Sequence, residues 1–264
     1  MLEREYRILV PMTVDEYRIG QIYMTVRHTE KETQAGTEVE VVVNEAREHP
    51  ELGPGHYTEK RYYLASKFPG WLAAIVPSNM YLCEKSWNCY PKTLTETTAS
   101  FCSSFYLRIE TLYTSPTPTE EAHQPSPLPI DVVDIVRDDY PKSHYLEAED
   151  PHYFTSIKTG RGPLREGWCS DPVIPKMLAI KRVSASFAFW GLQTKVESFT
   201  HQCLREIFLV GHRQAFAWID EWIELSEADV REYEEQVLAC ATRSHQSTAE
   251  THQHHHTAPD SLQR

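Results

Sequence analysis

Phe105-Tyr-Leu-Arg-Ile-Glu-Thr-Leu-Tyr113 alternates apolar and polar side chains, which is the pattern of a β-strand with one buried face. Similar patterns predict further strands on both sides of it, at 2–11, 38–44, 57–65, 79–91, 131–136 and 177–189. A long amphipathic helix is predicted next, over 192–222, with a bend near Gly211. Strands followed by a long helical section indicate an α+β fold, because a parallel sheet would alternate strands with helices.

Two shorter helices and two irregular segments complete this outline. Thr13-Val-Asp-Glu16 is a capping box, which predicts a helix from about Val14 to about His28. Ser226, three residues before Asp229, starts a last helix that we expect to end near Ala241. We predict one domain over 1–241, a mobile loop over 114–128, and a disordered, polar, His-rich tail over 242–264.

Composition narrows the class of protein and its surroundings. The formal net charge of −12 argues against nucleic-acid binding and against holding anionic membranes by bulk charge. The longest apolar run, Trp71-Leu-Ala-Ala-Ile-Val-Pro77, is too short to span a bilayer, and the N-terminus lacks an apolar signal core. The six cysteines show no metal spacing, so we expect free thiols. We therefore predict a cytoplasmic protein with brief, peripheral membrane contact.

No motif in the chain predicts catalysis or a cofactor. The nucleophile elbow, the phosphate-binding P-loop, the dinucleotide fingerprint and the H-E-x-x-H zinc motif are all missing from the sequence. Gly160-Arg-Gly162 lacks the strand and helix context of a nucleotide loop, and the histidines between 252 and 256 fit a solvated tail better than a metal site. A dispersed catalytic triad would escape this search. We predict no enzyme, no metal and no cofactor.

Two short segments instead suit contact with a membrane. Ser156-Ile-Lys-Thr-Gly-Arg-Gly-Pro-Leu-Arg165 is a basic loop broken by glycines, as a mobile gate would be. Phe189-Trp190 precedes the long predicted helix, and a tryptophan suits the membrane interface because its apolar ring carries a polar N–H.

Several longer strings resemble the phosphatidylinositol transfer proteins, from Glu5 to about Ala241. They are Thr58-Glu-Lys60, Glu84-Lys-Ser-Trp-Asn-Cys-Tyr-Pro91, Ser156-Ile-Lys-Thr-Gly-Arg-Gly-Pro163, Trp190-Gly-Leu-Gln193 and His212-Arg-Gln-Ala-Phe-Ala-Trp-Ile-Asp220. Within the family, the chain is most similar to the cytoplasmic single-domain type of class II, the retinal degeneration B beta type. The resemblance implies a START-like, helix-grip fold in which a concave, mostly antiparallel sheet and long C-terminal helices enclose one phospholipid. It also implies a monomer that exchanges phosphatidylinositol between membranes without chemistry.

Elementary physics agrees with an enclosed cargo. Exposing acyl chains to water costs about 0.8 kcal/mol per methylene group, so on the order of 20 kcal/mol or more for a phospholipid. A closed apolar cavity offsets that cost, and its lid must then open at the membrane because an enclosed lipid cannot leave otherwise.

The resemblance also carries over binding residues. It implies that the inositol ring meets Thr58, Lys60, Asn88 and Glu235, and that the phosphate meets Gln21, Thr95, Thr111 and Lys181. This set holds both donors and acceptors, as a polyol requires, and Lys181 is the natural counter-charge for a buried phosphodiester. Read alone, the threonines and lysines could equally be strand or surface residues. Glu234 adjoins Glu235, and a one-residue slip would exchange their roles.

Other positions imply membrane contact, modification and lipid choice. Phe189 and Trp190 match the membrane-inserting aromatic pair, and Ser156 matches a phosphorylatable serine. Thr93 replaces a cysteine of class I members that is associated with phosphatidylcholine, and Leu204 replaces a glutamate near the phosphate. Losing that acid removes a repulsive charge, so phosphatidic acid is predicted as a second ligand. The tail lacks the basic, serine-rich run that would predict binding to 14-3-3 adaptors.

Three functions compete on this sequence. The first is a lipid carrier. The second is a lipid-dependent regulator, which would present phosphatidylinositol to a signalling protein with little free transfer. The third, an enzyme with its active site in the cavity, would need a cluster of titratable residues that the predicted lining lacks.

Overall fold

The segments with strand patterns form one β-sheet. The computed structural model describes residues 1–64, 68–115, 125–188 and 191–255, with side chains as far as Thr242. The strands are β1 (Leu2–Val10), β2 (Glu38–His49), β3 (Gly53–Tyr63), β4 (Leu82–Cys89), β5 (Lys92–Ala99), β6 (Cys102–Thr114), β7 (Ile130–Val133) and β8 (Met177–Phe187). They form an eight-stranded sheet in the order β2-β3-β4-β5-β6-β8-β1-β7. Every neighbouring pair is antiparallel except β1 and β7, which are parallel.

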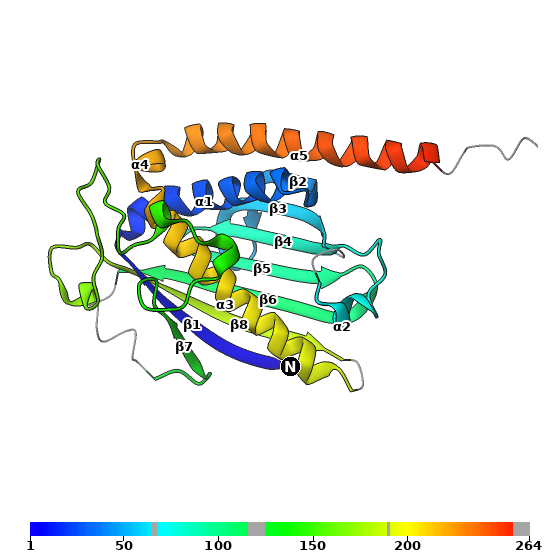
Figure 1. Cartoon of the computed structure of the whole chain (residues 1–264), viewed down its shortest axis with the longest axis horizontal. Coiled ribbons are helices and arrows are strands. Elements are labelled where there is room, and N and C mark those ends of the chain that lie inside the picture. The colour runs from blue at the N-terminus through cyan, green and yellow to red at the C-terminus, as the bar shows by residue number, and fades with distance from the viewer. Residues whose placement is uncertain (65–67, 116–124, 189–190, 256–264) are drawn as a thin grey trace, which may run out of the picture.

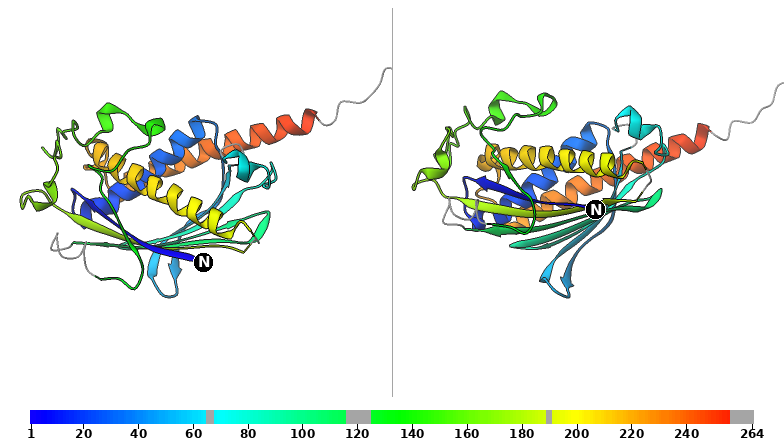
Figure 2. Two further views of the ribbon diagram at one scale, coloured as in Figure 1. Left: turned by 60° about the horizontal axis from the view of Figure 1, so that its bottom comes forward. Right: turned by 90° about the horizontal axis from the view of Figure 1, so that it is seen from below.

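Three long helices pack against this sheet. The helices are α1 (Val14–Gln34), α2 (Gly70–Ala73), α3 (Gln193–Ala217), α4 (Ile219–Trp222) and α5 (Glu227–His255), with 3-10 turns at Lys142–His144, Glu147–Glu149 and Trp168–Ser170. Helix α3 crosses the sheet over β8 and β1, whereas α5 lies along α1 and against β2 (Figure 1). The sheet is strongly curved, as the two further views show (Figure 2). The predicted α+β fold, with a mostly antiparallel sheet and long C-terminal helices, is confirmed.

The main core lies between the sheet and these helices. From β1, Tyr6 and Ile8 are fully buried, and from the α3–α4 junction Phe216 and Trp222 are fully buried. The predicted capping box starts α1: the Glu16 N–H donates to the Thr13 Oγ1 at 3.1 Å, and the Thr13 N–H donates to the Glu16 carboxylate at 2.8 Å. The cap therefore fixes where α1 leaves β1, and α1 then follows the sheet.

A second, smaller apolar cluster closes the other end of the sheet. It joins α2 to the start of α3 and the ends of β5 and β8 through Leu72, Val76, Met80, Ala99, Phe187 and Val196. The Trp71 ring packs edge-on against Phe199, and the Lys195 ammonium lies 4.1 Å from the centre of that ring. The apolar run at 71–77 therefore covers the sheet end.

Several predicted boundaries are wrong. The strand predicted over 79–91 is β4, but a separate strand, β5, follows it after a turn at Tyr90 and Pro91. Helix α1 continues to Gln34 instead of ending near His28, because α5 packs along it. The bend predicted at Gly211 is absent from the described α3, which runs unbroken to Ala217. A single helical glycine costs little when its surroundings are packed.

The last helix also extends past its predicted end. We expected it to stop near Ala241, with a disordered tail from 242, but α5 continues to His255. No glycine or proline interrupts the chain between 242 and 258, and adding residues to an existing helix is easier than starting one. Residues 256–264 lie outside the described part of the chain.

A close contact at Gly20 generates a stability prediction. A Cβ at Gly20 would lie 2.8 Å from the Trp222 ring, which is rigid and fully buried. Gly20→Ala should therefore lower the free energy of unfolding by about 1–3 kcal/mol, as overpacking does, when measured by urea denaturation. Gly211→Ala is the matched control, because its nearest neighbour is the flexible Met24 at 3.4 Å. Equal stabilities of the two variants would contradict this account.

Candidate functional site

A row of polar side chains crosses five strands of the sheet. The registers place side by side His56 of β3, Asn88 of β4, Thr93 of β5, Thr111 of β6 and Lys181 of β8. Paired residues on neighbouring strands point to the same face, so these side chains form one continuous line. We call this line the polar row.

Two further lines run parallel to the polar row on the same face. Successive residues of a strand alternate between faces, so the positions two and four residues along a strand share its face. The first neighbouring line is Thr58, Ser86 and Thr95, and the second is Lys60, Glu84 and Thr97. The structure thus brings Thr58, Lys60, Asn88, Thr93, Thr95, Thr111 and Lys181, all predicted from the sequence, onto one face of the sheet.

Lys181 is the most unusual member of the polar row. It is only 8% exposed, and its ammonium donates to the Thr111 hydroxyl at 3.3 Å. The ammonium also lies 5.0 Å from the Phe208 ring centre and 5.5 Å from that of Tyr113. In the part of the chain that the structure describes, it forms no ion pair. Burial accordingly lowers the pKa of Lys181 to about 8.

Other polar atoms of this face are also without partners. The Asn88 Oδ1 is buried and accepts no hydrogen bond within the described residues. Lys60 is 4% exposed, and no hydrogen bond or ion pair to another described residue holds its ammonium. Buried polar groups are normally paired, so this face is built to hydrogen-bond something other than the protein itself. By contrast, Ser86 and Thr95 hydroxyls bond each other at 3.2 Å.

Sequence reasoning missed two neighbours of Lys60. Glu84 faces Lys60 across the β3–β4 pair and accepts a hydrogen bond from the Tyr62 hydroxyl at 3.3 Å. Burial raises the pKa of Glu84, although Lys60 and Tyr62 oppose the shift. Strand alternation could have found both residues, because Glu84 lies four positions before Asn88 and Tyr62 two positions after Lys60.

The helices bring the remaining interior candidates to this face. Gln21 on α1 is 7% exposed, and its side-chain amide makes a 3.4 Å hydrogen bond to the Arg18 carbonyl. Leu204 on α3 is 7% exposed and belongs to the apolar core. It lies one helical turn before Phe208, whose ring contacts Lys181. The position of Leu204 therefore faces the sheet.

Glu235, which the resemblance places at the inositol ring, does not lie in the interior. Glu235 is exposed on α5, whereas Glu234 is 5% exposed and pairs with Arg231 at 2.7 Å. His56, at the β3 end of the polar row, interacts electrostatically with Arg231, Glu234 and Lys60. One residue rotates a helical position by about 100°, so a slip of one exchanges an interior carboxylate for a solvent-exposed one.

The predicted gate loop is tied down at two points. Ser156 is 1% exposed and its hydroxyl donates to Asp220, whose carboxylate also accepts the N–H groups of Ile157 and Lys158 at 2.8 and 3.1 Å. Arg161 forms two hydrogen bonds with Glu16, at 2.7 and 3.0 Å. A kinase could therefore reach the Ser156 hydroxyl only after the loop separates from Asp220. Phe189 and Trp190 lie outside the described residues.

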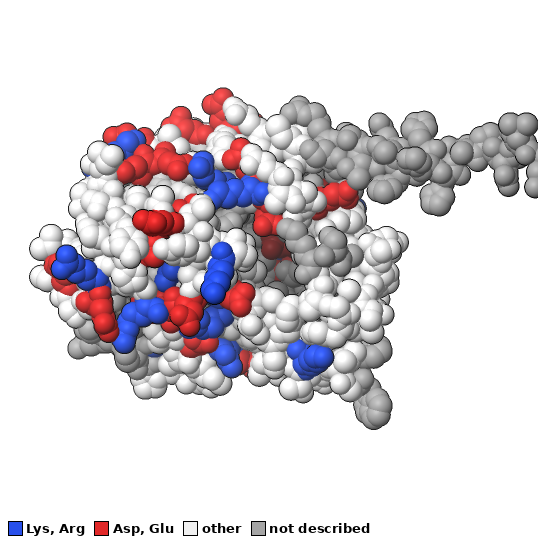
Figure 3. All heavy atoms as spheres, in the orientation of Figure 1, with Lys and Arg blue, Asp and Glu red and all other residues white. Residues whose placement is uncertain are grey.

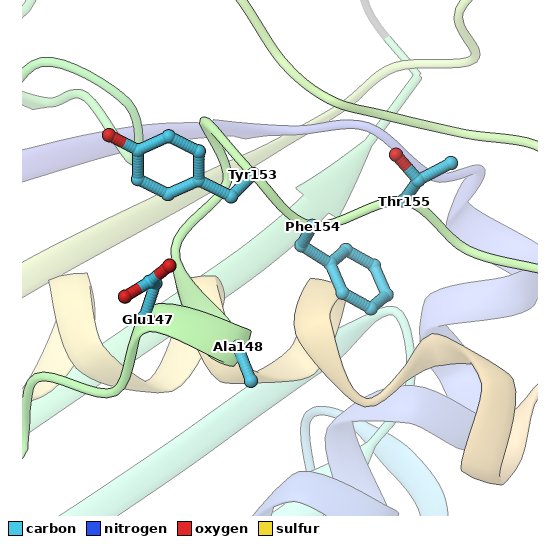
Figure 4. A pocket seen from close by; sticks show the side chains of 5 residues that line it. All are labelled: Glu147, Ala148, Tyr153, Phe154 and Thr155. Carbon is cyan, nitrogen blue, oxygen red and sulfur yellow. The ribbon is translucent and has the colours of Figure 1, made fainter.

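The surface shows two hollows. Between α1 and the elements below it the molecule is hollowed near its middle, and acidic side chains are visible there (Figure 3). An open pocket of about 520 Å³ lies in the segment between β7 and β8 and is lined by Glu147, Ala148, Tyr153, Phe154 and Thr155 (Figure 4). None of the predicted binding residues lines that pocket.

The described residues form neither a metal site nor a membrane-spanning helix. No group of three or more His, Cys, Asp and Glu side chains is placed to hold a metal ion there. None of the helices described combines the length and the apolar character that crossing a membrane requires.

Comparison with known proteins identifies close relatives. A family model described as "Phosphatidylinositol transfer protein" matches residues 1–239. "Cytoplasmic phosphatidylinositol transfer protein 1" of Homo sapiens is 48% identical over 89% of this chain and 72% of that protein. The Drosophila melanogaster protein of the same name is 47% identical over 90% of this chain and 89% of its own. "Membrane-associated phosphatidylinositol transfer protein 2" of Mus musculus is 40% identical over 92% of this chain and 19% of its own length.

The buried ammonium of Lys181 leads us to predict how the unfolding free energy of the lipid-free protein depends on pH. The folded pKa of about 8 lies below the usual lysine value of about 10.4, so the unfolded chain binds more protons between those two pH values. The cost of burying the charge is therefore fully present below pH 8 and is relieved as the pH rises toward 10.4, by up to roughly 3 kcal/mol.

The Lys181→Met variant isolates this effect, because it keeps an unbranched side chain only one atom shorter and removes the charge. The difference in unfolding free energy between Lys181→Met and the wild type should shrink steadily from pH 8 to pH 10, measured by urea denaturation. A difference that does not change with pH would show that Lys181 is not held in a desolvated site.

Proposed function

Because this chain belongs to the phosphatidylinositol transfer protein family, we propose that it holds one phospholipid between the sheet and α3 and carries it between membranes. The first cargo is phosphatidylinositol. Proteins of this family transfer lipids and are not enzymes. The observation that carries the proposal is the polar row: among the described residues, the buried Lys181 ammonium has no ion-pair partner and the buried Asn88 Oδ1 accepts no hydrogen bond.

Lys181 suits the lipid phosphate. A phosphodiester carries one negative charge, which matches the single charge of Lys181 and would remove the cost of burying it alone. The Thr111 hydroxyl already accepts from Lys181, so its own proton is free to donate to a phosphate oxygen. Thr95 on the neighbouring line and the buried Gln21 of α1 would supply further donors.

The β3–β4 end of the same face suits the inositol ring. Thr58 can both donate and accept, Lys60 donates, and the Asn88 Oδ1 accepts. Glu234 replaces Glu235 in this proposal as the carboxylate of α5. Choline and ethanolamine headgroups lack the ring hydroxyls that would satisfy these groups, so the site favours inositol.

The acyl chains would then extend toward the opposite end of the sheet. Toward that end, β6 and β8 present apolar side chains to the same face, namely Leu107, Ala185 and Phe105. The smaller apolar cluster, which joins α2 to the start of α3, covers this end of the sheet. On β6 and β8 this layout separates the proposed phosphate contacts, Thr111 and Lys181, from the apolar positions farther along the same strands.

Thr93 and Leu204 are the proposed selectivity positions. Leu204 offers no charge to the phosphate, so a phosphomonoester would meet no repulsion from α3. Phosphatidic acid is therefore the proposed second cargo, with phosphatidylcholine disfavoured. Competition from mixed vesicles tests this: equal loading of phosphatidylcholine and phosphatidic acid would refute it.

Membrane docking is proposed for the end that carries α2 and the start of α3. Phe189 and Trp190 precede α3 directly, and Ile75 beside α2 is 44% exposed. An acidic protein would dock briefly, through aromatic side chains and not through bulk charge. We propose that the protein acts in the cytoplasm, as the names of its relatives indicate for them, and works as a monomer.

The second candidate is a lipid-dependent regulator that presents phosphatidylinositol to a signalling protein. The acidic surface would suit such a partner. Transfer of labelled phosphatidylinositol between pure vesicles, with no other protein added, decides between the two. Rapid transfer supports the carrier, whereas tight loading with negligible transfer supports the regulator, and mass spectrometry of the copurifying lipids identifies the cargo in either case.

Lys60 provides a test of the headgroup assignment. Lys60→Met should lower loading of phosphatidylinositol by about tenfold, because a hydrogen bond from a charged donor is lost. Loading of phosphatidic acid, which has no inositol ring, should hardly change. Lys85→Met is the matched control, since Lys85 is the exposed lysine on the other face of β4. A parallel loss of both lipids would contradict the assignment.

The two glutamates of α5 provide a second test. Glu234→Gln should reduce phosphatidylinositol loading several-fold, because it removes the interior carboxylate next to His56. Glu235→Gln should leave loading unchanged, because that side chain is exposed. Bound lipid measured by mass spectrometry after exchange with vesicles gives the answer, and the reverse order of effects would restore the sequence-based assignment.

A further inference from the structure

His212 is a buried titratable residue to which neither the sequence nor the family comparison assigns a role. It is 3% exposed on α3, one turn after Phe208 and two turns after Leu204, so it continues the stripe of α3 that faces the sheet. Its ring stacks on Tyr17 of α1 at 5.9 Å and 12°. Tyr17 in turn packs edge-on against Tyr113, which contacts the Lys181 ammonium. His212 therefore lies beside the phosphate end of the polar row.

Hydrogen bonding fixes which ring nitrogen carries the proton. The His212 Nδ1 lies 2.6 Å from the Phe208 carbonyl oxygen, which can only accept, so the Nδ1 must be the donor. Burial, aided by the charge of Lys181, lowers the pKa of His212 to about 3, so the ring is neutral at physiological pH. The Nε2 therefore presents a lone pair. It is buried, and no described residue donates to it.

The site thus offers one positive charge and one unused acceptor. The charged or titratable groups packed around His212 are Lys181 from β8 and Tyr17 from α1, with Tyr113 from β6 contacting both. A single ammonium balances a phosphate with one negative charge. A phosphodiester has one charge and no proton to donate. A phosphomonoester with one charge carries a P–O–H group, which needs an acceptor when it is buried.

We propose that the His212 Nε2 accepts a hydrogen bond from the P–O–H group of a singly charged phosphomonoester lipid, and so favours phosphatidic acid over phosphodiester lipids. The inference rests on the proposed lipid-carrying function. No bond is made or broken: the Nδ1–H stays on the Phe208 carbonyl, Lys181 meets the charged phosphate oxygens, and the Nε2 receives the remaining proton of the phosphate.

Two variants separate the two ring nitrogens. In His212→Asn the side-chain N–H can still reach the Phe208 carbonyl, but the acceptor at the Nε2 position is lost. In His212→Gln the longer side chain can return an acceptor oxygen to that position. Each purified protein is exchanged with phosphatidylcholine vesicles that contain equal amounts of phosphatidylinositol, phosphatidic acid and phosphatidylmethanol, and bound lipids are measured by mass spectrometry. Phosphatidylmethanol has the same single charge but a methyl group in place of the proton.

The expected result is specific to one lipid. His212→Asn should lower the loading of phosphatidic acid relative to phosphatidylinositol by about tenfold, because a buried hydroxyl is left unpaired. Its loading of phosphatidylmethanol should match that of the wild type, and His212→Gln should recover most of the preference for phosphatidic acid.

Two results would overturn the proposal. One is an unchanged ratio of phosphatidic acid to phosphatidylinositol in His212→Asn. The other is an equal loss of all three lipids in both variants together with a lower melting temperature, which would show a purely structural role. A wild-type protein that takes up none of the lipids would instead refute the carrier function itself, so the two failures are distinguishable.

Discussion

A positive charge with no ion-pair partner among the described residues is buried between the sheet and α3, and the rest of the fold can be understood around it. Placing an ammonium under α3 is costly, since the described neighbours of Lys181 are a hydroxyl and two aromatic rings. A bound anion would remove that cost. If the lipid phosphate is that anion, as proposed above, an empty molecule should be less stable than a loaded one.

One carboxylate connects the cap of α1 to the loop beyond Ser156. Glu16 accepts the Thr13 N–H and also holds the Arg161 guanidinium, while Asp220 holds the start of the same loop. The loop is therefore attached both to the helix that carries Gln21 and to the junction that follows α3. Opening of the loop would have to break both attachments. Movement of the loop would therefore also displace the helices that cover the face of the sheet with the polar row.

Alternation along strands made most of the sheet and most of its site predictable. Thr58 and Lys60, or Thr93 and Thr95, share a face for geometric reasons, and the family resemblance supplied their roles. Prediction failed where a decision depended on one residue or on distant packing. Glu234 and Glu235 differ only in which side of α5 faces β2, which the local sequence does not settle. β5 was not predicted, because its residues lie between the two predicted strands 79–91 and 101–113, and α1 was predicted too short because its last turns are held by α5. His212 was overlooked because nothing near it in sequence marks a histidine whose second nitrogen lacks a partner.

The threonine-rich lining has a consequence for how the protein could change its cargo during evolution. Hydroxyl protons rotate freely, so Thr58, Thr95 and Thr97 can each reverse the direction of a hydrogen bond without any movement of the backbone. Such a surface is permissive: it adapts to many oxygen-rich headgroups and rejects few of them. Discrimination must then come from the groups whose polarity cannot be reversed, namely the ammonium groups, the carboxylates and a ring nitrogen. A new headgroup preference would accordingly need changes at very few positions, against a hydroxyl background that could remain as it is.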